Sequence, residues 1–257
     1  MVNIFTFLIG LAFGSFANVI IYRLPLNKSI IKPPSACVSC NRQLTIIDLI
    51  PVLSWLVLRA RCRTCKAKIS VRYPLVELIC GLLFVFMAIY SPSLSAIPLC
   101  ALAFVLLTVS FIDLETQEIP DGFMIFGAAW GIAWVTLGSF FPILFPHSQT
   151  WLNALLGAVA GVAPLFIIDR LTIFIAGKDG FGYGDYKLMA VVRLFLGWQI
   201  TLGAFFFAFI GGGVFAAFLL VTDRAKRGEY IAFGPFLCMG ALAALWFGER
   251  LFSVLVG

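Results

Sequence analysis

Eight long apolar runs divide the sequence, and they restrict the fold to a bundle of helices in a membrane. The runs lie near 2–22, 74–91, 95–113, 122–141, 151–176, 186–198, 200–222 and 231–254. A helix crosses the hydrocarbon core with roughly 20 apolar residues, because its backbone polar groups are paired internally. A mean hydropathy of +1.06 and a charged fraction of 12% exclude an ordinary soluble domain. The sequence predicts an all-α polytopic membrane protein of about eight apolar helices.

Two of these runs are atypical. The first has no basic leading region and no small-residue cleavage pattern, so we expect it to remain as a span rather than be removed as a signal peptide. The sixth, at 186–198, rises only about 20 Å at 1.5 Å per residue, which is too short for a full crossing. We expect the sixth run to be a half-depth or tilted helix beside a polar cavity.

Basic residues are concentrated in one connection, between the first and second runs. That connection holds ten of the eighteen Lys and Arg residues. Because Lys and Arg mark the cytoplasmic side, residues 23–73 are predicted to be cytoplasmic, and alternation places 113–121, 177–187 and 222–230 on the same side. The net charge of +6 indicates contact with anionic lipids rather than nucleic acid.

The predicted organisation has three parts. Residues 1–22 form the first transmembrane helix, residues 23–73 a cytoplasmic subdomain (here called the cysteine segment), and residues 74–257 the helical membrane core. The sequence contains no feature that predicts an oligomeric state.

Four cysteines of the cysteine segment form two Cys-x-x-Cys pairs. Cys37 and Cys40 are separated by 21 residues from Cys62 and Cys65, close to the spacing of structural zinc sites with four thiolates. A disulfide or free thiols are the weaker alternative, because the predicted compartment is reducing. We expect a structural zinc ion, since four thiolates leave no open position for catalysis.

Two aspartates at the edges of apolar runs are the best candidates for chemistry. Asp113 ends the third run, and Asp185 closes the tetrad Gly182-Tyr183-Gly184-Asp185 before the sixth. An ionisable side chain at membrane depth is costly and is therefore a functional-site hypothesis. Two carboxylates that share one proton can deprotonate water and protonate a peptide carbonyl. The alternative is a structural role, in which Asp113 is a solvated helix-end group and Asp185 is a helix N-cap.

Other classes of function fit the sequence less well. The only histidine, His147, falls on the predicted outer side, so His-dependent triads and HExxH metalloproteases are unsupported. A non-catalytic zinc-loop assembly factor remains open. An ion- or proton-coupled transporter is disfavoured, because both acids lie at one face and not at mid-membrane.

The residues resemble a family, the bacterial type IV prepilin leader peptidases, also called prepilin peptidase/N-methyltransferases, which belong to the Gly-x-Gly-Asp aspartic peptidases. The resemblance covers nearly the whole chain, and its motifs are specific only in combination. They are Gly14-Ser15-Phe16-Ala17-Asn18-Val19 with Arg23-Leu24-Pro25, the two cysteine pairs, Asp48-Leu49-Ile50-Pro51, Arg72-Tyr73-Pro74-Leu75-Val76-Glu77, Asp113 with Ile119-Pro120-Asp121, Gly182-Tyr183-Gly184-Asp185-Tyr186-Lys187-Leu188, and Phe233-Gly234-Pro235-Phe236-Leu237.

The resemblance implies an enzyme of the bacterial inner membrane that cuts the basic leader from type IV prepilins or type II secretion pseudopilins at the cytoplasmic face. Asp113 and Asp185 map onto the catalytic pair, and Gly182, Gly184 and Lys187 support the loop. Many members also methylate the new N-terminus with S-adenosylmethionine.

The sequence does not locate that methyl donor, because it has no glycine-rich dinucleotide-type fingerprint. Glu77 and the motif at 14–25 are candidates by resemblance. For Glu77 we favour a different interpretation, a charge that snorkels from the start of the second span.

One position departs from the family pattern. The family usually has glycine eight residues after the second aspartate, and this chain has Arg193. Arg193 is about 80° around a helix from Asp185 and two turns along, so it could face the same cavity. A guanidinium there would favour ionised carboxylates.

Overall fold

The computed structural model describes residues 2–146, 148–177, 180–222 and 231–256, and these residues are helical apart from connections and two isolated bridges. The helices are α1 (Val2–Arg23), α2 (Leu53–Val57), α3 (Arg72–Tyr90), α4 (Ala96–Thr116), α5 (Asp121–Phe140), α6 (Trp151–Ala176), α7 (Tyr183–Val221) and α8 (Gly234–Val256), with a short 3-10 helix η1 (Ile46–Leu49). Within the described residues, six helices are long and apolar enough to cross a membrane, and α8 adds a shorter apolar stretch. The predicted all-α membrane fold is confirmed.

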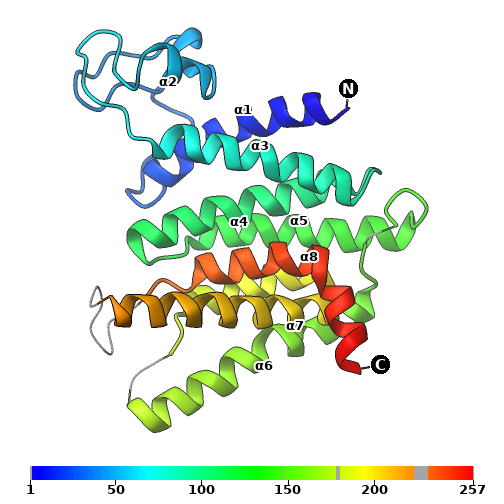
Figure 1. Cartoon of the computed structure of the whole chain (residues 1–257). Helices are drawn as coiled ribbons and strands as arrows, with labels where there is room; N and C mark the ends of the chain where they lie inside the picture. The colour runs from blue at the N-terminus through cyan, green and yellow to red at the C-terminus, as the bar shows by residue number, and fades with distance from the viewer. Residues whose placement is uncertain (1, 147, 178–179, 223–230, 257) are drawn as a thin grey trace.

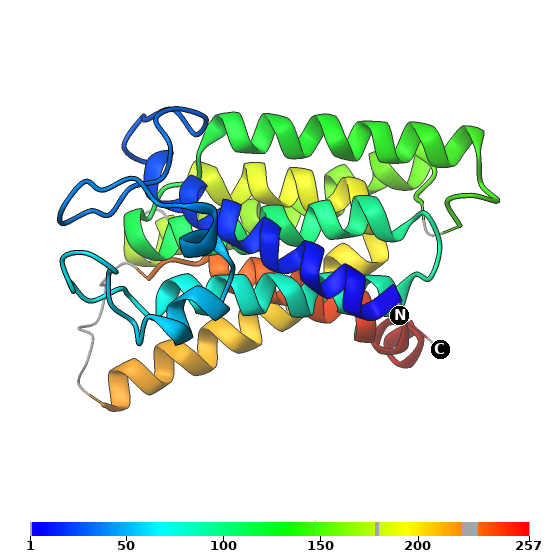
Figure 2. The same cartoon turned by 90° about the horizontal axis from the view of Figure 1, so that it is seen from above.

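Helix α7 consists of two limbs that run in opposite directions. Gly197 has φ 70° and ψ 179°, outside the helical region. Figures 1 and 2 show the chain leaving the end of the bundle where α6 ends and returning to that same end after Gly197. The positive φ favours glycine, because a side chain there is sterically strained. The runs predicted at 186–198 and 200–222 therefore correspond to the two limbs of α7, before and after Gly197.

Helix α4 lies at the centre of the bundle. It is the most buried of the apolar helices, and it contacts α1, α3, α5, α7 and α8. A polar side chain on α4 is consequently surrounded by protein rather than by lipid, and this determines the environment of Asp113.

Small residues join α1 to α3. A Cβ added to Gly10 would lie 2.7 Å from the Cα of Gly81, and one added to Gly14 would lie 2.6 Å from the Cα of Glu77. Such close backbone approach at small residues is typical of helix pairs in membranes. The packing places the last turn of α1 beside the start of α3.

The polar connections gather at one end of the bundle. Figure 1 shows the cysteine segment, the turn between α4 and α5, and the start of α7 at this end, whereas α1 begins and α8 finishes toward the other. These connections are the ones that alternation predicts to share a side. The predicted segment 222–230 is described only at Thr222, and residues 178 and 179 of the predicted segment 177–187 lie outside the described residues.

Candidate active site and metal centre

Asp113 lies in the last turn of α4 and is held by the start of α8. Its side chain is almost fully buried, and its Oδ2 accepts a hydrogen bond of 3.0 Å from the backbone N–H of Gly234. A Cβ added to Gly234 would lie 2.6 Å from that oxygen, so the contact requires glycine. The Phe-Gly-Pro motif near the end of the chain therefore orients a carboxylate 121 residues earlier.

Asp185 is the third residue of α7, and it too is buried. Its Oδ2 accepts a hydrogen bond of 3.1 Å from the backbone N–H of Gly182, which is the N-cap residue of the helix. The alternative in which Asp185 is itself the N-cap is wrong by three positions. The carboxylate still caps the helix, because it pairs an N–H group that the first turn leaves free.

The two aspartates line one cavity, which we call the acid cavity. Its volume is about 540 Å³, and its walls come from the turn after α1, the α4–α5 turn and the start of α7. The end of α4 thus brings Asp113, and the first turn of α7 brings Asp185, to the same space. Within the described part of the chain, each carboxylate bonds a backbone N–H through Oδ2, and Oδ1 makes no hydrogen bond. The arrangement leaves one oxygen of each acid for a reactant.

The other predicted residues of this region surround the acid cavity. Gly184 lets α7 approach the α4–α5 turn, because a Cβ there would lie 2.9 Å from the Cβ of Ile119. The ammonium group of the exposed Lys187 pairs with Asp121 at the rim. Lys187 thus joins α7 to α5, and its charge does not enter the space between the two acids.

Asp169 is a functional candidate that the sequence analysis missed. It lies in α6 with 9% of its surface exposed, and its Oδ1 accepts hydrogen bonds from the backbone N–H groups of Gly180 at 2.9 Å and Phe181 at 3.4 Å. These residues lead directly into Gly182, so Asp169 positions the turn that presents Asp185. The available signal was an acid inside the apolar run 151–176, which is costly unless it serves a purpose.

Replacing Asp169 with Ala is expected to lower kcat/KM for the reaction of this site by roughly 10- to 100-fold, through loss of charge-assisted hydrogen bonds to the turn. Asp169→Asn keeps a carbonyl acceptor and is expected to restore most of the activity. Equal rates for Asp169→Ala and the wild-type protein would contradict the positioning role, as would equal impairment of the two variants.

Glu77 does not snorkel, contrary to the favoured interpretation. Its side chain is buried, and Oε2 accepts a hydrogen bond of 2.7 Å from the backbone N–H of Val52 in the cysteine segment. Val52 has φ 60° and ψ −50°, and a positive φ is strained for a β-branched residue. Glu77 therefore fixes a strained turn of the cysteine segment to α3.

The four cysteines converge as predicted. Their Sγ atoms all lie within 4.8 Å of one another, which suits a single tetrahedral metal ion. Each pair lies in a loop closed by one antiparallel bridge, Ala36 with Gln43 and Arg61 with Lys68. Hydrogen bonds from the backbone of Cys65 and Thr64 lower the pKa of Cys62 to about 6, which favours the thiolate form that a metal ion requires.

Asp48 ties the two cysteine loops together. Burial opposes its ionisation, but hydrogen bonds from Arg42 at 2.7 Å and Arg63 at 2.9 Å prevail and hold the pKa of Asp48 well below its usual range. Thr45 donates to the same carboxylate. Since Arg42 follows the first cysteine pair and Arg63 lies within the second, Asp48 links both halves of the four-cysteine cluster.

A second cavity, here called the segment cavity, lies between the cysteine segment and helices α1, α3 and α4. Its volume is about 600 Å³. Three polar atoms of its lining residues are buried without a hydrogen-bond partner among the described residues: Asn18 Oδ1, Arg42 Nε and Arg72 Nε. Buried polar groups are normally paired, so these atoms indicate a site for a polar ligand or ordered water.

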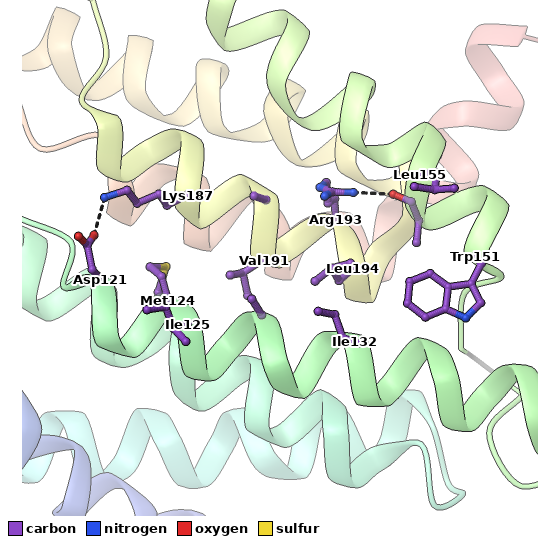
Figure 3. A pocket seen from close by; sticks show the side chains of 13 residues that line it. Asp121, Met124, Ile125, Ile132, Trp151, Leu155, Lys187, Val191, Arg193 and Leu194 are labelled. Carbon is purple, nitrogen blue, oxygen red and sulfur yellow. Dashed lines mark hydrogen bonds and ion pairs between the residues drawn. The ribbon is translucent and has the colours of Figure 1, made fainter.

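Arg193 does not face the acid cavity. Figure 3 shows its guanidinium directed toward α6, where Nη1 donates a hydrogen bond of 2.6 Å to the carbonyl of Ala154. Gly157 and Gly161 of α6 make room for it, since a Cβ on either would meet the Arg193 side chain at 3.5 and 3.3 Å. The expectation that Arg193 could act directly on the two aspartates is therefore wrong, because it projects from a different face of α7.

Comparisons with known proteins agree with this arrangement. A family model described as "Bacterial Peptidase A24 N-terminal domain" matches residues 8–91, and one described as "Type IV leader peptidase family" matches residues 100–217. Proteins named "Prepilin leader peptidase/N-methyltransferase" from Aeromonas salmonicida (strain A449) and Stutzerimonas stutzeri are 32% and 34% identical to the chain, and each match covers 95% of this chain and 90% of the relative. A Myxococcus xanthus (strain DK1622) protein of that name is 38% identical over 86% of this chain and 64% of its own length. No solved structure matches the chain significantly.

Proposed function

The chain belongs to the type IV leader peptidase family, and from that premise we propose that it cleaves the leader peptide of prepilins with Asp113 and Asp185 as its catalytic residues. The observation that carries this proposal is the shared acid cavity, which is lined by two carboxylates from distant parts of the chain. The enzyme is a multi-pass membrane peptidase that also methylates the new N-terminus. Pseudopilins of type II secretion are substrates of the same kind, with a basic leader before an apolar segment.

Peptide hydrolysis assigns complementary roles to the two acids. One carboxylate takes a proton from the attacking water while the other, protonated, donates to the carbonyl oxygen of the scissile bond. The backbone N–H groups of Gly182 and Gly234 orient the two carboxylates during both steps. Once the tetrahedral intermediate has formed, the two acids have exchanged protonation states. The acid that is now protonated gives its proton to the leaving nitrogen, the other takes a proton from a hydroxyl of the intermediate as the C–N bond breaks, and both acids return to their starting states.

We place the end of the bundle that carries the cysteine segment and the acid cavity in the cytoplasm. The ten basic residues of 23–73 support this orientation. The basic leader of a substrate would then remain in the cytoplasm, where the substrate is synthesised, and the substrate's apolar segment would stay in the bilayer. In this arrangement residues 23–73 form the cytoplasmic subdomain with the four cysteines, and residues 74–257 form the membrane core with the two aspartates.

We propose zinc as the ion of the four-cysteine cluster. The donor set fits, because four thiolates bind zinc in closed tetrahedral sites that stabilise small domains with little secondary structure. The cysteine segment is such a domain, with only η1 and α2 as helical elements. The ion's role is structural, and it stabilises the fold of the segment.

The segment cavity fits the methyl donor, S-adenosylmethionine, which would supply an electrophilic methyl group when bound. Its volume lies in the range of roughly 300–1,000 Å³ usual for small-molecule sites. The unpaired Nε atoms of Arg42 and Arg72 can donate to a carboxylate, Trp55 offers an aromatic face, and Asn18 offers an unpaired acceptor. Glu77, buried in the same wall, can accept a proton or a hydrogen bond from the substrate's amine.

The two cavities adjoin each other. Tyr22 and Arg23 line the segment cavity, whereas Leu24 and Pro25 immediately after them line the acid cavity. The end of α4 also borders both cavities, since Glu115 lines the segment cavity and Thr116 lines the acid cavity. A new N-terminus made at the acid cavity therefore has to move only past the residues that separate the two cavities to reach the methyl donor.

Detergent-solubilised protein incubated with a prepilin, with and without S-adenosylmethionine, tests the proposed function. Mass spectrometry of the product is expected to show the leader removed in both samples and one added N-terminal methyl group only with the methyl donor. Intact prepilin in both samples would refute the peptidase assignment.

The segment cavity is tested separately by binding of S-adenosylmethionine. The variant Arg72→Met is expected to bind the donor roughly tenfold more weakly, through loss of a charged hydrogen bond, while leader cleavage is unchanged. Lys28→Met, which removes an exposed charge that lines neither cavity, is the matched control. Unaltered donor affinity in Arg72→Met would exclude this cavity.

A further inference from the structure

A groove opens between α5 and α6 on the side of the bundle that Figure 3 shows. Its volume is about 570 Å³, and the first limb of α7 forms its floor with the buried residues Val191 and Leu194. Ile125 on the α5 wall and Leu155 on the α6 wall are 69% and 64% exposed. Helices α5 and α6 scarcely touch each other, so the groove faces the surrounding bilayer. An apolar groove of this kind accepts an apolar chain or helix.

One end of the groove opens at the acid cavity. Asp121 lines both spaces, and it pairs with Lys187 at the end of the groove shown on the left of Figure 3. Lys187 is two residues from Asp185. A chain whose cleaved bond lies at the two aspartates can therefore continue directly into the groove, toward Trp151 at its other end.

A positive charge lies part of the way along the groove. Arg193 lines the groove, and its Nε is buried without a hydrogen-bond partner among the described residues. The four ion pairs of the described residues do not include it. A guanidinium at membrane depth is costly unless anions or acceptors meet it, and among the described residues the carbonyl of Ala154 meets only its Nη1. The groove therefore has charge complementarity for an apolar segment that carries a carboxylate.

We propose that this groove binds the apolar helix of the substrate and that Arg193 binds a carboxylate on that helix. The proposal rests on the proposed peptidase function and identifies where its substrate docks. Arg193 follows Asp185 by eight residues, about 12 Å along the helix. The carboxylate accordingly lies about four residues beyond the cleaved bond if the substrate is extended there, and about eight if it is helical.

Photo-crosslinking from the groove tests the docking site. The background is Asp185→Asn, which retains uncleaved substrate, and benzoylphenylalanine replaces either Ile132 in the groove or Leu137 as the control. Both residues lie on α5 and are similarly exposed, at 48% and 44%, but Leu137 does not line the groove. We expect the substrate's apolar segment to crosslink at Ile132 several-fold more strongly. Equal yields, or crosslinks from Ile132 to lipid alone, would overturn the proposal.

A double-mutant comparison tests the carboxylate. The probes are a synthetic substrate with one Glu at each of the two expected positions, about four and about eight residues beyond the cleaved bond, and the same substrate with Gln at both. Arg193→Gln is expected to raise KM roughly tenfold for the Glu substrate, the effect of one charge-assisted hydrogen bond, and to change it little for the Gln substrate. Equal effects on both substrates would overturn the pairing. Failure of the wild-type protein to cleave either substrate would instead refute the peptidase function itself.

Discussion

Replacing either Asp113 or Asp185 with Asn is expected to abolish prepilin cleavage, with a loss of roughly 10³-fold or more in kcat, because each acid supplies a proton-transfer step that the other cannot replace. The double variant is expected to be no slower than either single variant, since the two residues act as a unit. Cleavage is measured as the rate at which the leader is released from a prepilin in detergent. Asparagine is nearly isosteric with aspartate, so the hydrogen bonds from Gly182 and Gly234 can remain.

Glu118→Gln is the matched control for these variants. Glu118 lines the same acid cavity but is exposed on the α4–α5 turn. Its neutralisation is expected to leave kcat close to the wild-type value. Full activity in Asp113→Asn or Asp185→Asn would refute the catalytic assignment, whereas a strong loss in Glu118→Gln would show that the whole rim, and not the pair, determines activity.

Replacing Cys40 with Ser is expected to remove the bound metal, from about one equivalent of zinc per chain to nearly none, and to unfold the cysteine segment. Cys62 is the only buried residue of 23–73, so the segment has almost no apolar core and the metal contributes most of its folding free energy. Zinc is measured by atomic spectrometry and folding by trypsin cleavage at the many basic residues of 23–73. A chelator is expected to reproduce both effects in the wild-type protein.

This variant also separates the two activities. Cys37 and Cys62 line the segment cavity, but no residue of 28–73 lines the acid cavity. We therefore expect Cys40→Ser to lose methylation and to retain most of its cleavage activity. Cys100→Ser, which changes a buried cysteine outside the cluster, is the control and should keep both. A Cys40→Ser variant with full zinc content would exclude the four-thiolate site.

The sequence predicted three features, because each depends on residues that are close together in the chain. They are the helix-forming runs, the four clustered cysteines and the two aspartates at the edges of apolar runs. Apolar length predicts a span, the Cys-x-x-Cys spacing predicts a metal knuckle, and an acid in an apolar run is conspicuous. Asp169 carried that last signal as well but was overlooked. The polarity of the connections also predicted that 23–73, 113–121 and the start of α7 share one end of the bundle.

The remaining features depend on contacts between distant segments. No local pattern shows that Gly234 bonds Asp113, that Glu77 supports Val52, or that Arg193 projects toward α6. Sequence alone therefore determined that this chain crosses a membrane, carries four cysteines that suit a metal ion, and has two costly carboxylates in apolar runs. Only the tertiary structure decided that those carboxylates share a cavity and that a polar cavity and an apolar groove adjoin it, because side-chain direction and helix packing are set by residues far apart in the chain.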